Sequence, residues 1–138
     1  MFWKKKPLPG GPTEGREAQS ATVVELAKRL IVLMREIAPD WQVAYYRYQK
    51  GPGETASNGS YVQGTDVTLI GAMRHGAFYN AMASLSADLL AGKPRAVLLL
   101  RASSDFSYDV KFDYDDLDRW TITKLDGRTG IPEGESSP

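Results

Sequence analysis

The spacing of apolar positions along the chain predicts two helices. The first apolar stripe recurs at the 3.6-residue period of a helix and consists of Leu26, Leu30, Leu33, Met34 and Ile37. Thr22 and Glu25 have the spacing of an N-terminal capping box, and Pro39 disfavours continuation, so we place this helix at about residues 22–38. The second stripe has the same period and consists of Phe78, Ala81, Met82, Leu85 and Leu89. It predicts a helix at about residues 77–90.

Segments rich in aromatic and β-branched residues predict the strands. They lie at about residues 41–48, 61–70, 95–102 and 108–114, with a possible short final strand at 121–125. The segment 95–102 is apolar on both faces, which is typical of a central strand covered on both sides. Apolar and charged residues alternate in the segment 108–114, so its inward residues are Tyr108, Val110, Phe112 and Tyr114, and its outward residues are Asp109, Lys111 and Asp113. We expect Gly51–Gly59 to be a loop that turns at Asn58-Gly59.

The order of these elements predicts an α+β fold. A helix, two strands, a second helix and two or three further strands favour an antiparallel sheet of four to five strands with two helices packed on it. A chain of 138 residues suits one domain, which we place at residues 18–128. Residues 1–17 are basic and rich in Pro and Gly and are expected to form a disordered tail, and residues 129–138 a flexible C-terminal tail. Phe2 and Trp3 stand beside three lysines and could touch an anionic membrane, but six residues offer little area for binding.

The composition removes much of the chemistry that enzymes use. The chain has no Cys, which excludes disulfides, thiol catalysis and cysteine-type zinc sites and fits a reducing, cytoplasmic compartment. No signal-peptide pattern and no apolar run of transmembrane length appears. No phosphate-binding glycine loop is present, and the spacing around Asp113 does not fit a calcium-binding loop. We therefore expect no catalytic residue, cofactor or metal. A hydrolase that uses the one histidine, His75, with a nearby Asp is a further alternative, although a solvated loop histidine is favoured.

The net charge of zero conceals two segments of opposite charge. Residues 1–50 carry nine basic and five acidic residues, whereas residues 101–138 carry five basic and nine acidic ones. The neutral total disfavours direct binding of nucleic acid. One interpretation of the acidic run is a solvated outer face that keeps a sheet edge from aggregating. The other is a patch that attracts a basic protein partner.

Eight residues are candidates for binding a partner under the second interpretation. The acidic ones are Asp109, Asp113, Asp115, Asp116 and Asp118. The possible aromatic anchors are Tyr46, Tyr48 and Trp120, because Trp and Tyr dominate binding hot spots. Packing in the core is the alternative for each of these three.

The run Phe106-Ser107-Tyr108-Asp109-Val110-Lys111-Phe112-Asp113-Tyr114-Asp115-Asp116-Leu117, followed by Trp120, resembles the C-terminal signature of the YezG-like immunity proteins. The junction Ala38-Pro39-Asp40-Trp41 before an aromatic strand is also similar to that family, and the resemblance covers about residues 22–122. The basic start and Gly51–Gly76 do not match. The resemblance implies an α+β antitoxin that binds a cognate secreted toxin, often a nuclease, without a cofactor. The alternative is a small non-enzymatic adaptor or ligand-binding domain that uses the aromatic face of the first strand.

Overall fold

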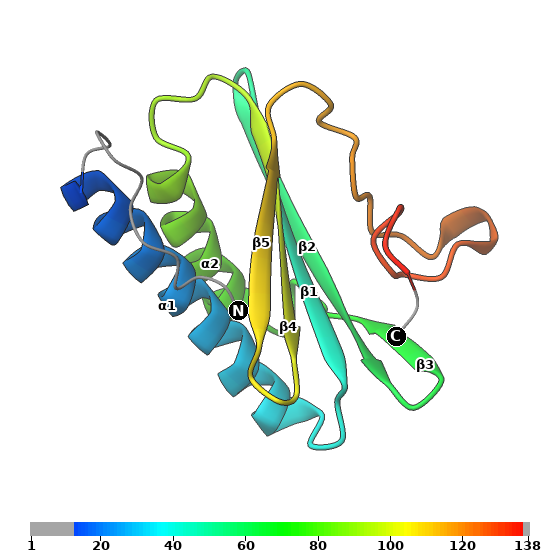
Figure 1. The fold of residues 1–138 in the computed structure, drawn as a ribbon. Coiled ribbons are helices and arrows are strands. Elements are labelled where there is room, and N and C mark those ends of the chain that lie inside the picture. Colours follow the sequence, from blue (N-terminus) through cyan, green and yellow to red (C-terminus); the bar gives the residue numbers. More distant parts are fainter. Residues whose placement is uncertain (1–12, 137–138) are drawn as a thin grey trace.

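Five antiparallel strands form one sheet, and two helices pack on one of its faces (Figure 1). The computed structural model describes residues 13–136. The elements are α1 (Thr13–Ile37), β1 (Val43–Gly51), β2 (Glu54–Gln63), β3 (Asp66–Leu69), α2 (Gly76–Leu89), β4 (Ala96–Ser103), β5 (Tyr108–Asp113) and a 3-10 turn at Leu125–Gly127. The strand order across the sheet is β3-β2-β1-β4-β5. The predicted α+β class, with two helices on an antiparallel sheet, is confirmed.

The fifth strand comes from a hairpin that the apolar pattern did not reveal. The segment predicted as one strand at 61–70 folds back on itself, so that Val62 pairs with Val67 and Gln63 with Asp66. The possible final strand at 121–125 is wrong, because residues 121–124 lie outside the sheet and a 3-10 turn begins at Leu125. The predicted turn at Asn58-Gly59 is wrong, because both residues lie inside β2 and the chain turns at Pro52-Gly53. Gly53 has φ +79°, which suits the third position of a type II turn after proline.

Gly59 is needed for close packing between strands and not for a turn. A Cβ at this position would lie 2.6 Å from the backbone oxygen of Tyr45 and 3.2 Å from Cδ1 of Ile70. A glycine inside a strand often marks such an approach of another backbone. The Asn-Gly pair therefore resembles a hairpin turn in sequence while serving a different role in the fold.

The helix α1 begins earlier than its predicted capping box. It starts at Thr13, so residues 13–17 of the expected tail are helical, and residues 1–12 lie outside the described residues. The apolar stripe of α1 packs on the sheet as expected, since Leu26, Leu30 and Met34 are completely buried. The helix α2 agrees with its prediction to within one residue at each end.

Two apolar cores lie on opposite faces of the sheet. On the helix side, Tyr46, Leu98 and Leu100 pack with residues of α1 and α2. On the other side, Tyr45 and Leu99 pack with Trp120 of the C-terminal segment. The central strand β4 is therefore covered on both faces, as its continuous apolar run predicts.

The C-terminal segment that follows β5 covers the face of the sheet opposite the helices (Figure 1). Ile131 packs on this second core, and Pro132 is fully buried. The backbone N–H of Glu133 donates to the oxygen of Thr121 at 3.0 Å. Residues 130–135, which we placed in a flexible tail, are thus part of the packed domain. Within residues 13–136, neither helix has the length and hydropathy that crossing a membrane requires.

Candidate functional site

The acidic residues after β5 form a turn that the side chain of Asp113 organises. One carboxylate oxygen of Asp113 accepts hydrogen bonds from the backbone N–H groups of Asp115, at 2.8 Å, and Asp116, at 2.9 Å. The other oxygen accepts a hydrogen bond from Nη1 of Arg119 at 2.9 Å and forms an ion pair with it. We call residues 113–119 the acidic turn. Short-range acceptors of this kind fix a turn because Asp competes well for neighbouring backbone donors.

The hydrogen bonds to Asp113 also change its ionisation. The backbone N–H groups of Asp116 and Asp115, together with Arg119, lower the pKa of this carboxyl to about 2. Each of these donors favours the charged form. The carboxylate of Asp113 therefore binds groups within the turn. It does not face a partner directly, as the sequence-based prediction had it.

Arg47 holds the acidic turn from beneath. This residue lies on β1 and is only 7% exposed. Its guanidinium donates from Nε to the backbone oxygen of Arg119 at 2.8 Å and from Nη2 to that of Leu117 at 2.5 Å. Burial lowers the pKa of the Arg47 guanidinium, and the carboxylates of Asp118 and Asp116 oppose part of this lowering. A buried cation thus fastens the underside of the turn to the centre of the sheet.

The chain beyond the turn is fastened by two further contacts. Trp120 adopts φ +62° and is 3% exposed, with the guanidinium of Arg119 lying 4.6 Å from its ring centroid. A positive φ at a bulky residue costs energy and persists only where surrounding contacts enforce it. Nδ2 of Asn58 donates to the oxygen of Ile122 at 2.9 Å. Together with Arg47, this contact determines the path of residues 117–122 over the sheet.

Three of the predicted acidic residues remain exposed together on this support. They are Asp115, Asp116 and Asp118. One oxygen of Asp116 accepts from the backbone N–H of Asp118 at 3.0 Å, and the backbone oxygen of Asp115 accepts from Arg95 at 2.7 Å. Asp109 does not belong to this group, because it lies earlier on β5, half-buried and across from Arg101 in the register of β4.

The predicted aromatic anchors are not at the surface. Tyr46 is completely buried, and Tyr48 and Trp120 are each 3% exposed. Tyr46 packs against α2, where its ring lies 6.2 Å from that of Tyr79. Burial raises the pKa of Tyr46 to about 12, despite opposing contributions from Ser86 and Ser57. All three residues serve the core, which is the alternative that the sequence left open, and the proposal that they anchor a partner is wrong for this conformation.

Two structural residues of the site were missed from sequence. The sequence did contain a signal for the structural role of Arg47. It is the one charge among the aromatic residues of β1, and it lies on the same face as Val43 and Tyr45. An isolated buried arginine needs acceptors, so its position implied a covering segment with free carbonyl groups. The role of Asn58 had no comparable signal, because its pairing with Gly59 favoured a turn.

His75 lies at the start of α2. His75 precedes the first residue of α2, and its oxygen accepts from the N–H of Tyr79 at 3.1 Å. Its side chain is partly exposed. Among the described residues, no group of three His, Cys, Asp or Glu side chains is placed to hold a metal ion.

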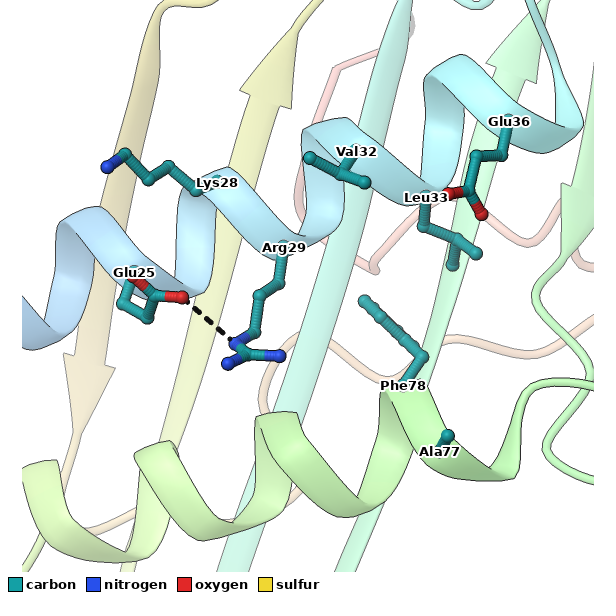
Figure 2. A pocket seen from close by; sticks show the side chains of 8 residues that line it. All are labelled: Glu25, Lys28, Arg29, Val32, Leu33, Glu36, Ala77 and Phe78. Carbon is teal, nitrogen blue, oxygen red and sulfur yellow. Dashed lines mark ion pairs between the residues drawn. The ribbon is translucent and has the colours of Figure 1, made fainter.

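A groove between α1 and α2 is the second feature that a ligand could use. It has a volume of about 540 Å³, and Figure 2 shows Phe78 of α2 directed toward α1. Arg29 pairs with Glu25 at 3.1 Å along its side. Two acidic and two basic side chains line it, namely Glu25, Glu36, Lys28 and Arg29. The charges of these four side chains sum to zero, so they give the groove no excess of either sign.

Comparisons with known proteins give no assignment. No protein-family model matches the chain, and no curated protein is similar enough to count as a match.

Proposed function

We propose that the protein is a stoichiometric inhibitor of the immunity-protein kind, which binds a basic toxin domain through the acidic turn. The observation that carries the proposal is the exposed group Asp115, Asp116 and Asp118 on a turn that Asp113 and Arg47 hold in place. A preformed surface binds at a lower entropic cost than a mobile one. The resemblance to the YezG-like family supports the same function.

The charge of the turn suits a nuclease as the partner. Enzymes that act on nucleic acid present basic clefts, because their substrate is a polyanion. Exposed carboxylates accelerate the encounter with such a cleft and select against acidic proteins. The inhibitor occupies the cleft of the toxin and needs no catalytic residue, metal or cofactor of its own.

The adaptor that uses the aromatic face of β1 is a weaker alternative. Tyr46 and Tyr48, which would form that face, are enclosed by the core. The hydrolase based on His75 stays a further alternative, because the hydrogen bond from the N–H of Tyr79 involves the backbone oxygen of His75 and not its imidazole. Replacing His75 by Ala is expected to leave the inhibitory activity unchanged.

Co-expression with the product of an adjacent toxin-like gene tests the proposal. The wild-type protein is expected to form a stable complex with the toxin and to restore growth of the host cells. The variant Asp115→Asn/Asp116→Asn/Asp118→Asn should lose most of this protection. A control variant with the same change in net charge, Asp40→Asn/Asp66→Asn/Asp88→Asn, removes exposed carboxylates elsewhere and should protect like the wild type. Failure of the wild-type protein to bind or neutralise any adjacent gene product would contradict the proposal.

A further inference from the structure

β5 is an edge strand whose outer side is open to another strand. Within residues 13–136 its only strand neighbour is β4, and Figure 1 shows its other side lying between the helix layer and the C-terminal segment. At the hairpin, the N–H of Ser103 donates to the oxygen of Ser107 at 2.9 Å. Hydrogen-bonded pairs alternate along an antiparallel ladder, so the backbone groups of Asp109 and Lys111 face β4. The backbone groups of Val110 and Phe112 consequently point away from β4, toward the outer side of the strand.

The side chains of β5 complement those of a second β5 in one antiparallel register. When Val110 stands opposite Val110 of a second copy, Asp109 stands opposite Lys111 of that copy. The reverse pair, Lys111 opposite Asp109 of the second copy, follows from the two-fold symmetry. On the helix-facing side, Tyr108 stands opposite Phe112 of the second copy. Opposite charges and aromatic pairs across strands are both stabilising.

Neighbouring registers lose this complementarity. A shift by one residue would place outward backbone groups opposite groups that are already bonded to β4. A shift by two residues in one direction places Asp109 opposite Asp109 of the second copy. The same shift in the other direction places Lys111 opposite Lys111 and Asp109 opposite Asp113. Like charges directly across a ladder are destabilising.

The surroundings of β5 are compatible with this pairing. Tyr108, Val110 and Phe112 pack against the helix-side core and are only partly buried, so a second sheet could cover them further. Lys111 already pairs with Glu135 at 2.7 Å, but its ammonium group has three donors and can meet a second carboxylate. Charged residues on an edge usually discourage pairing between sheets, whereas here opposite charges match in one of the registers that the backbone allows.

We propose that two copies of this chain associate through β5 to form a continuous ten-stranded sheet around a two-fold axis at Val110. The number of strands follows from five in each copy. The paired residues are Asp109 with Lys111 and Tyr108 with Phe112, each pair occurring twice.

Sedimentation equilibrium of the full chain, from micromolar to submillimolar concentration, tests the dimer. The wild type should be dimeric at the upper end of this range. In a dimer of Asp109→Lys, the introduced lysine lies opposite Lys111 of the second copy. In a dimer of Lys111→Asp, the introduced aspartate lies opposite Asp109 of the second copy. Each variant alone should therefore dimerise about tenfold or more weakly, given two reversed pairs per dimer. An equimolar mixture of the two variants restores both opposite-charge pairs and should form a heterodimer.

Two further variants distinguish lost pairing from lost folding. Val110→Pro removes an N–H that points away from β4 and should leave the thermal unfolding of the monomer cooperative while abolishing the dimer. Asp88→Lys makes the same charge change as Asp109→Lys on the exposed side of α2 and should leave dimerisation unchanged. A monomeric wild type throughout the range, or a mixture that stays as monomeric as its components, would overturn the proposal.

Discussion

The carboxylate of Asp113 lies 2.9 Å from the guanidinium of Arg119, and the same carboxylate accepts two backbone N–H groups of the turn between them. The acidic turn is therefore held by one of its own acidic residues. Because Asp113 is satisfied internally, its contribution to the proposed binding of a partner is indirect, through the positions that it gives to Asp115 and Asp116.

Asp113 should make stability depend on pH in the acid range. Its pKa in the folded protein is lowered to about 2, below the ordinary value of 3.8. The stabilisation is therefore complete above about pH 4 and is lost as the pH falls toward 2, because the unfolded chain binds the proton first. Thermal unfolding of wild type and Asp113→Asn between pH 2 and pH 6 should show a larger difference at pH 6 than at pH 2. The exposed Asp88→Asn serves as the control, and a difference that does not change with pH would exclude this role.

Replacing Arg47 by Met should loosen the acidic turn more than the sheet. The variant keeps the apolar stem but removes the donors to the backbone oxygens of Leu117 and Arg119. Leaving such carbonyl groups without a partner costs about 1–3 kcal/mol. Chemical denaturation measures that loss, and hydrogen exchange should become faster at residues 117–122. The matched variant Arg95→Met removes one exposed contact to Asp115 and should cost less than about 0.5 kcal/mol. Equal effects of the two variants would show that Arg47 does not support the turn.

Gly59→Ala should destabilise the sheet strongly. The added Cβ would meet the backbone oxygen of Tyr45 at 2.6 Å, and backbone atoms cannot move aside as a flexible side chain does. Overpacking of this kind costs about 1–3 kcal/mol. Gly71→Ala provides the comparison, since no atom lies within 4 Å of its added Cβ. Similar free energies of unfolding for the two variants, measured in urea, would contradict the close approach described for β2.

The elements that follow a simple period could be predicted from the sequence. The apolar stripe of α1 and the continuous apolar run of β4 gave both the type of element and the buried side, because burial depends directly on those patterns. The alternation along β5 likewise predicted which residues face the helices. These features depend on local spacing and need no knowledge of distant partners.

The parts that were not predicted depend on contacts between distant residues. The segment from residue 115 to residue 136 has no regular period, yet Arg47 and Asn58 hold it on the sheet from positions about 60 to 75 residues earlier. Packing on the second core buries Trp120, whose place at the surface or in the core the sequence left open. Of the acidic run, Asp115, Asp116 and Asp118 lie exposed together, whereas the separate place of Asp109 and the internal role of Asp113 required the geometry of the fold.

The most direct test of the acidic turn is the rate at which the protein associates with the proposed toxin partner at different salt concentrations. In stopped-flow experiments, the wild type should associate rapidly at low ionic strength and more slowly as salt screens the carboxylates. Asp115→Asn/Asp116→Asn/Asp118→Asn should associate at least about tenfold more slowly at low salt, with a weaker dependence on ionic strength. The control Asp40→Asn/Asp66→Asn/Asp88→Asn should behave much like the wild type. Equal association rates for the wild type and the acidic-turn variant at low salt would contradict the account.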